Sequence, residues 1–170
     1  MRRGPWLWKG IAGIAIIAGS FFGTLWTLRG PEIPRPITLE NTSISDEASL
    51  KAAARAAGFQ VDLERIKGNI DSLKRLSPSQ VTISGWVVDL EGNGDPIKLF
   101  GFSENKGIFQ VQTDGGRQDV AESFMMPADL PVMKNVSFTA TTSCRAGAKV
   151  FIAAFGRKNR YLALPPVTCP

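Results

Sequence analysis

Four oxygen-bearing side chains alternate through one short stretch of the sequence, "DLEGNGDP": Asp89, Glu91, Asn93 and Asp95. Oxygen ligands at alternate positions with a glycine in sixth place are typical of a calcium-binding loop. Glu91 stands where the pattern takes Asp or Asn, and Phe100 stands in the twelfth position, where a ligating Glu is required. Glycine, asparagine and proline at 92–96 are typical of a turn between strands. We therefore expect a turn, with a weak calcium site at the four residues as the alternative, and no other metal or cofactor.

A second cluster lies near the C-terminus, where "GRKNRY" places four residues in one expected hairpin turn: Arg157, Lys158, Arg160 and Tyr161. Residues 130–170 hold six basic residues and no acid, whereas residues 89–129 hold eight acids and three bases. Cations beside an aromatic ring suit lipid headgroups, acidic glycans or an acidic protein surface. The turn is thus a candidate binding site, and an ordinary solvated turn is the competing interpretation.

The sequence contains few of the residue types and motifs that catalyse reactions. The chain has no histidine, which excludes Ser-His-Asp and Cys-His centres, histidine zinc sites and a histidine general base. Glycine-rich phosphate loops and CxxC motifs are also missing. The pairs Ser49/Lys51 and Ser72/Lys74 are two apart on expected helices, so their side chains diverge. The acids fall in expected turns and do not suggest the paired carboxylates of a glycosidase. We expect no catalytic residues and no enzyme.

The first 28 residues predict a membrane anchor. Residues 10–28 form an uncharged run, long enough as a helix to cross a bilayer. The flank at 1–9 holds Arg2, Arg3 and Lys9, and only Arg29 follows the run, which places the N-terminus in the cytoplasm. A cleaved signal peptide is the alternative, with a poor cleavage site near Ala18. Both interpretations export the remainder, and the first predicts a single-pass protein of the bacterial inner membrane with a periplasmic C-terminal domain.

The net charge of +5 does not point to nucleic acid. All 15 acids and 16 of the 20 basic residues follow residue 30, so the exported part carries 16 − 15 = +1. Nucleic-acid binding requires a basic surface on the folded domain, and we exclude it. Residues 29–45 are proline-rich and form the expected linker.

Residues 46–77 predict a helical segment. Residues 46–57 are alanine-rich, with acids first and bases later, and Gly58 ends this helix. Beyond it, apolar residues spaced 4, 3, 4, 3 predict an amphipathic helix. The seam consists of Phe59, Leu63, Ile66, Ile70 and Leu73. This helix is expected to pack on the domain or a partner, and a weak homodimer through a short coiled coil is the alternative.

Residues 80–170 predict the main domain. Short β-rich runs separated by turn residues indicate strands at 81–89, 97–103, 108–113, 136–143, 150–156 and 160–164. One helical turn is expected within 117–124. The fold class is an all-β, immunoglobulin-like antiparallel sandwich, with Trp86 as its core aromatic residue. Cys144 and Cys169 lie in the exported part, which predicts a disulfide that closes a loop of about 25 residues; two unpaired thiols are the alternative.

The strand "SGWVVD", a glycine-rich turn, the strand "LFGFS" and the segment "GGRQDVAESF" resemble an immunoglobulin-like module of bacterial, alphaproteobacterial-type envelope proteins. These modules combine a Gly-Trp-x-x-Asp strand with an Arg-x-Asp-Val-Ala segment, and the resemblance covers residues 81–155. The matching residues are Gly85, Trp86, Asp89, Arg117, Asp119, Val120 and Ala121. Gln118 stands where the segment takes proline, so the loop differs there. The resemblance implies a non-catalytic accessory domain. Arg117 and Asp119 are expected to pair and fix the crossover loop, with a binding role as the alternative.

Taken together, these features predict a non-catalytic, membrane-anchored periplasmic binding or scaffolding protein, with an envelope protein as its partner. The alternative is a carbohydrate- or lipid-binding module that recognises an anionic envelope polymer through Arg157, Lys158, Arg160 and Tyr161.

Overall fold

The computed structural model describes residues 44–103 and 106–170. The predicted basic flank at 1–9, the anchor at 10–28 and most of the linker at 29–45 lie outside this part of the chain. Within it, no helix is both long enough and apolar enough to cross a membrane.

The first element is the predicted alanine-rich helix, α1 (Glu47–Ala56). The side chain of Asp46 accepts a hydrogen bond from the backbone N–H of Ser49 at 2.7 Å, and the Ser49 hydroxyl in turn accepts from the Asp46 N–H. This reciprocal capping box satisfies donors that the first helical turn leaves free. Gly58 follows the helix with φ of 85°, a conformation that glycine adopts without strain.

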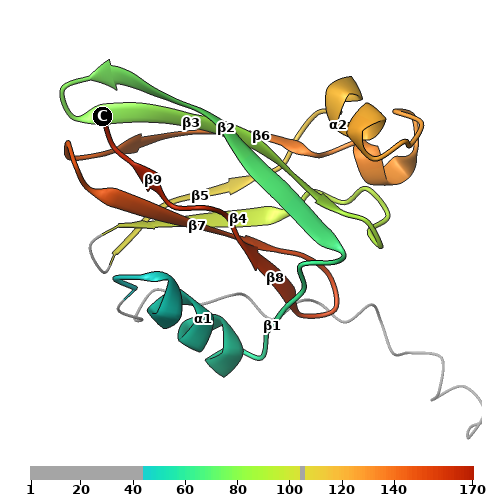
Figure 1. Cartoon of the computed structure of the whole chain (residues 1–170), viewed down its shortest axis with the longest axis horizontal. Helices are drawn as coiled ribbons and strands as arrows, with labels where there is room; N and C mark the ends of the chain where they lie inside the picture. The colour runs from blue at the N-terminus through green and yellow to red at the C-terminus, as the bar shows by residue number, and fades with distance from the viewer. Residues whose placement is uncertain (1–43, 104–105) are drawn as a thin grey trace, which may run out of the picture. The chain divides into compact units, whose positions relative to one another are not determined.

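Nine strands within the described residues form two sheets (Figure 1). Their bounds are β1 (Gln60–Val61), β2 (Ile66–Ser77), β3 (Gln80–Asp89), β4 (Lys98–Ser103), β5 (Lys106–Gln112), β6 (Ser137–Ser143), β7 (Lys149–Phe155), β8 (Arg160–Ala163) and β9 (Val167–Thr168). The larger sheet has the order β1-β8-β7-β4-β5 with β9 beside β7, and the smaller has the order β2-β3-β6. All six predicted strands are present to within two residues. The pairing is antiparallel except between β1 and β8, which run parallel.

The main core lies between the two sheets. In Figure 1 the β2–β3–β6 sheet lies above the larger sheet, and α1 lies on the far side of the larger sheet. Alternate residues of β3 and β7 point into the core, among them Val81, Ile83, Val150 and Ile152, each with no exposed surface. The opposite alternation on β7 and β8 places Phe155 and Tyr161 on the outer face, with their rings stacked at a centroid distance of 5.9 Å.

The predicted second helix is wrong: most of its sequence forms strand β2, which pairs with β3. Ile66 and Ile70 share a face because side chains four apart in a strand point the same way. A β-bulge between Ile70 and Ser72 then inserts one residue and reverses the alternation, so that Leu73 returns to the core face. The bulge therefore produces the 4-3 spacing of an amphipathic helix within a strand.

This correction also changes the role of the other seam residues. Leu63 lies before β2 and is 61% exposed, and Phe59 packs edge-to-face on Phe155 at 4.9 Å. The five apolar residues form no helical interface, and the coiled-coil homodimer that depended on that interface loses its basis. Residues 66–77 belong to the sandwich, which therefore begins before the predicted boundary at residue 80.

The prediction that Trp86 is the core aromatic residue is also wrong, because Trp86 does not lie in the core between the sheets. Trp86 alternates along β3 with the core-facing residues Ile83 and Val87, so its side chain lies on the outer face of the smaller sheet. There its ring packs edge-to-face on Phe124, with the ring centroids 5.9 Å apart. The part of this face around Trp86 and Val88 is covered by the segment that contains α2 (Gln118–Ser123) and the 3₁₀ helix η1 (Pro131–Met133). Met133 in this segment is completely buried. The domain thus has a second small core around Val88, Ala121 and Met133.

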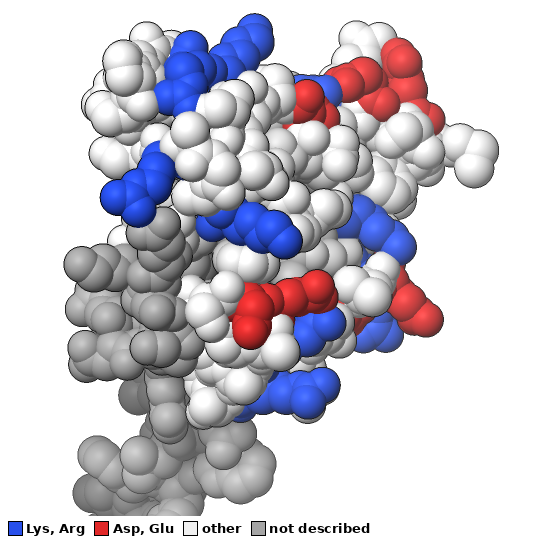
Figure 2. Space-filling view, turned by 60° about the vertical axis from the view of Figure 1, so that its left-hand side comes forward, with Lys and Arg blue, Asp and Glu red and all other residues white. Residues whose placement is uncertain are grey.

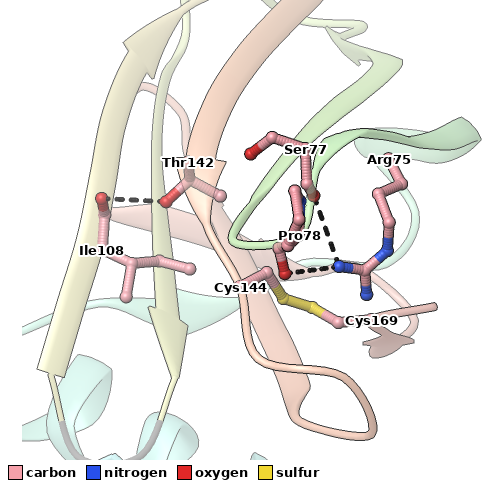
Figure 3. The surroundings of a disulfide bond; sticks show 7 residues. All are labelled: Arg75, Ser77, Pro78, Ile108, Thr142, Cys144 and Cys169. Carbon is pink, nitrogen blue, oxygen red and sulfur yellow. Dashed lines mark hydrogen bonds between the residues drawn. A yellow bond between two sulfur atoms is a disulfide. The ribbon is translucent and has the colours of Figure 1, made fainter.

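The predicted disulfide between Cys144 and Cys169 is confirmed (Figure 3). The two Cα atoms are 6.1 Å apart, and the bond ties the tail after β9 to the end of β6. Both residues are buried. Beside them, the guanidinium of Arg75 donates to the carbonyl of Pro78 at 2.7 Å and orders the β2–β3 turn.

Candidate functional site

The acidic turn after β3 and the basic turn before β8 lie against each other. Arg160 is 5% exposed, and its Nη2 lies 3.3 Å from Oδ1 of Asp89, which is 4% exposed. Its Nη1 lies 3.0 Å from Oε2 of Glu91 and 3.5 Å from Oδ2 of Asp62. The two clusters that the sequence presents as separate candidate sites are therefore partners in one ion-pair network.

Further ion pairs surround this centre. Lys158 Nζ lies 3.2 Å from Glu91 Oε2, Arg157 Nη2 lies 3.1 Å from Asp95 Oδ2, and Arg65 Nε lies 2.8 Å from Glu91 Oε1. Four cations (Arg65, Arg157, Lys158 and Arg160) thus face four carboxylates (Asp62, Asp89, Glu91 and Asp95). We call these eight residues the charge cluster, and its formal charges sum to zero.

Backbone geometry holds the charge cluster in place. Lys158 and Asn159 both have φ of 54°, and the N–H of Arg160 donates to the carbonyl of Arg157 at 3.2 Å. Positive φ at both central residues is the requirement of the tight hairpin turn that matches strand twist. The Asp89 carboxylate accepts from the N–H groups of Arg157 and Glu91, each at 3.2 Å. It therefore links the two turns through backbone as well as side chains.

Two carboxylates of the charge cluster, Glu91 and Asp62, have a lowered pKa. The hydrogen bond from Lys158, followed by the charge of Arg65, holds the pKa of Glu91 below its ordinary value. Burial opposes ionisation of Asp62, but backbone hydrogen bonds from Arg65 and Glu64 outweigh it, and the pKa of Asp62 also lies below its ordinary value. A general acid needs a carboxyl group that is protonated near neutral pH, so these shifts run opposite to what a general acid at Glu91 or Asp62 would need.

The calcium alternative is not supported by the arrangement of its four residues. Asp89 and Glu91 contact Arg160, Asp95 contacts Arg157, and Asn93 Oδ1 accepts from the Asp95 N–H at 3.3 Å within the turn. Among residues 44–103 and 106–170, no group of three His, Cys, Asp or Glu side chains could hold a metal ion. The stretch acts as the turn that the sequence favours.

Tyr161, predicted to line the basic turn, points away from it. The residue has no exposed surface, and its ring lies on the outer face of the larger sheet. Burial raises the pKa of its hydroxyl above the ordinary value. Among the described residues this hydroxyl has no hydrogen-bond partner. Tyr161 therefore packs under the surface and is not a binding residue of the turn.

The predicted pair of Arg117 and Asp119 is confirmed, and a third residue joins it. Arg117 Nε donates to Asp119 Oδ1 at 2.8 Å, and its Nη1 donates to Oδ2 of Asp71 at 2.5 Å. Asp71 lies at the β-bulge of β2, so the crossover segment is fixed to the smaller sheet at its irregular point. The hydrogen bonding that Arg117 donates to Asp119 lowers the pKa of that carboxyl to about 2.

An exposed apolar surface follows α2, and sequence patterns did not identify it. Met125 is 94% exposed with φ of 55°, and Leu130 is 36% exposed. In the sequence, the stretch "FMMPADLP" shows only that two methionines are adjacent. It does not show which of the two side chains is buried and which is exposed. The neighbouring Phe124 and Met126 pack on the outer face of the smaller sheet.

A shallow groove of about 650 Å³ lies beside the disulfide, at the end of the sandwich. Its lining includes Pro78 from the β2–β3 turn, Ile108 from β5 and Cys144 after β6, which Figure 3 places together. Of its described lining residues, only Arg145 is charged. The groove therefore has no arrangement of groups that indicates a specific ligand.

Charges elsewhere on the domain are mixed. Figure 2 shows Lys and Arg side chains in several separate groups on one face, with Asp and Glu side chains beside some of them. This face carries no broad patch of one sign, and such a patch would be expected of a surface that attracts a polyanion over distance.

No protein-family model matches the chain, and no curated protein matches it. Among solved structures, the chain is similar to the sensor domain of the anti-sigma factor RsgI4 from Pseudobacteroides cellulosolvens. The TM-score is 0.37 and the identity 11%, over 64% of this chain and 97% of that chain. A likeness of this degree carries no functional argument. The resemblance to bacterial envelope modules stays a prediction.

Proposed function

We propose that this chain is a non-catalytic binding or scaffolding protein of the bacterial cell envelope, anchored by residues 10–28 with its sandwich domain in the periplasm. The observation that carries the proposal is the exposed apolar surface at Met125 and Leu130 on a domain whose charged turns neutralise each other. Large side chains that fill a pocket of the partner carry much of the binding energy of protein interfaces, and Met125 is the most exposed of the large apolar residues that the structure describes. The disulfide supports an oxidising compartment.

A protein partner is favoured over an anionic polymer for a specific reason. Arg157, Lys158 and Arg160 each contact a carboxylate of the same domain. A polyanion would have to displace these carboxylates, and the ion pairs it gained would replace ion pairs that were lost. The basic turn therefore offers little net attraction for glycan or lipid headgroups.

The membrane topology is tested on the protein as it is produced in cells. Intact-mass measurement of the membrane-extracted chain should include residues 1–28, and protease added from the periplasmic side should digest the sandwich domain. A mass that begins after residue 18 would establish a cleaved signal peptide. A domain that protease reaches only from the cytoplasmic side would contradict the proposal.

The binding function is tested by photocrosslinking in the native membrane from three exposed positions, Leu63, Leu76 and Ala128. We expect a discrete crosslinked protein from at least one position, identified by mass spectrometry. Crosslinks to glycan or lipid alone would reject a protein-binding role. In that case, Arg157→Glu with Lys158→Glu would test whether the basic turn provides the contact.

A further inference from the structure

Both helices of the described chain end in the same backbone motif. After α1, Gly58 N–H donates to Arg55 at 2.9 Å and Phe59 N–H donates to Ala54 at 2.8 Å. After α2, Met125 N–H donates to Glu122 at 2.9 Å and Met126 N–H donates to Ala121 at 3.0 Å. These bonds define the Schellman C-cap, which places one residue in the left-handed conformation. Gly58 occupies that position in α1, with φ of 85°, and Met125 occupies it in α2, with φ of 55°.

Methionine is an unfavourable residue at this position for two separate reasons. A residue with a Cβ atom is strained at positive φ, where glycine is not. The Met125 side chain is also 94% exposed, so its apolar surface remains in water. Burial of the loop depends on other residues, because Met126, which follows Met125, packs against the small core that contains Ala121. The folded domain therefore gains nothing from the Met125 side chain that could offset either cost.

The segment that carries Met125 is rigidly supported. Phe124 packs on Trp86, and Met133 after it is fully buried. Asn135 Nδ2 donates to the carbonyl of Gly94 at 2.6 Å, and Gly94 lies so close to Pro131 that a Cβ atom at residue 94 would collide with the proline carbonyl. A side chain presented by a fixed loop loses little entropy when it binds.

The chemistry around Met125 indicates the kind of partner. Leu130, five positions further along the same segment, is 36% exposed. Glu122 and Asp129 are exposed and form no ion pair with any Lys or Arg that the structure describes. This contrasts with the charge cluster, where every carboxylate contacts a cation. The surface thus combines an apolar centre with uncompensated negative charge.

We propose that Met125, Leu130, Glu122 and Asp129 form a protein-docking tip, with Met125 as its anchor. The partner is a protein with an apolar pocket for Met125 and basic residues on the rim of that pocket. This inference rests on the proposed binding function and assigns that function to one surface. Methionine suits such an anchor because its flexible thioether adapts to irregular pockets.

The strain argument is tested by a pair of matched substitutions in the full chain, extracted in detergent. Met125→Gly removes the unfavourable side chain from the left-handed position and should raise the Tm by about 3–5 °C. Gly58→Ala introduces a Cβ atom at the equivalent position of α1, where no atom lies within 4 Å, and should lower the Tm by a similar amount. A lower Tm for Met125→Gly would show that the side chain supports the fold and would overturn the inference.

Binding is tested with a photocrosslinker at Ala128, which leaves Met125 in place, and with Leu76 on β2 as the control position. Met125→Gly and Met125→Asp should each reduce the Ala128 crosslink at least tenfold, and Glu122→Lys with Asp129→Lys should also reduce it. None of these variants should change crosslinks from Leu76. The crosslinked partner peptide should contain Lys or Arg next to apolar residues.

The outcomes separate the two proposals. Protein crosslinks from Leu63 or Leu76 but none from Ala128 would overturn the docking tip and leave the binding function intact. An Ala128 crosslink that Met125→Asp does not weaken, or one that joins two copies of this chain, would also overturn it. If no position crosslinks to protein, both proposals fail.

Discussion

Arg160 is the residue on which the charge cluster depends. It is buried among Asp62, Asp89 and Glu91, and the equally buried Asp89 has no other cation within contact among the described residues. Arg160→Met should lower the free energy of unfolding by about 3–5 kcal/mol, because it leaves a buried carboxylate without its counter-ion. Urea unfolding of the full chain in detergent measures the effect. Lys158→Met is the control: Lys158 is 73% exposed, so a loss equal to that of Arg160→Met would contradict this assignment.

Asp119 gives a pH-dependent prediction. Its ordinary pKa of 3.8 falls to about 2 in the folded protein because Arg117 donates hydrogen bonds to it. A carboxyl group whose pKa is lower when folded adds stability that is complete above pH 4 and is lost as the pH falls toward 2. The difference in unfolding midpoint between the natural chain and Asp119→Asn should therefore be constant from pH 5 to 8 and shrink as the pH falls from 4 toward 2. A difference that is as large at pH 2 as at pH 7 would contradict the pairing.

At the scale of elements, β2 is the clearest difference between expectation and structure. Its apolar spacing fits a helix because a bulge shifts the alternation by one residue. Whether a chain forms a bulged strand depends on a partner strand, and β3 supplies that partner through backbone pairing that no local pattern encodes.

The two assignments of this segment can be distinguished by mutation. A helical seam would make Leu63 and Ile66 similarly sensitive, whereas in the structure Leu63 is 61% exposed and Ile66 has no exposed surface. Ile66→Ala should lower the free energy of unfolding by about 2–5 kcal/mol. Leu63→Ala should lower it by less than about 1 kcal/mol. Equal losses in urea unfolding would favour the helix.

At the scale of the whole molecule, the disulfide fixes the end of the chain to the sandwich. Replacing Cys144 and Cys169 together with Ala should lower the free energy of unfolding by about 3 kcal/mol, because the unfolded chain regains the freedom of a loop of 25 residues. Hydrogen exchange should quicken at residue 169, whose N–H donates to Ala148 at 2.9 Å. The N–H of Val87, which donates to Val136 at 2.8 Å in the smaller sheet, should remain protected. Equal loss of protection at both sites would show that the bond supports the entire fold.

The sequence by itself determined features that depend on neighbours along the chain. These include α1 and its glycine cap and six of the strands. The disulfide was predictable for another reason, because its partners are the only two cysteines of the sequence. The ion pair of Arg117 with Asp119 is also local, because the two residues are two positions apart. The tertiary structure decided what depends on residues far apart in the sequence. Arg160 and Asp89 are 71 positions apart, and only the packing of two sheets makes the basic turn the counter-ion of the acidic one. The exposure of Met125 likewise follows from which of two adjacent methionines the sheet covers, because burial is set by the surface that a side chain meets and not by its type.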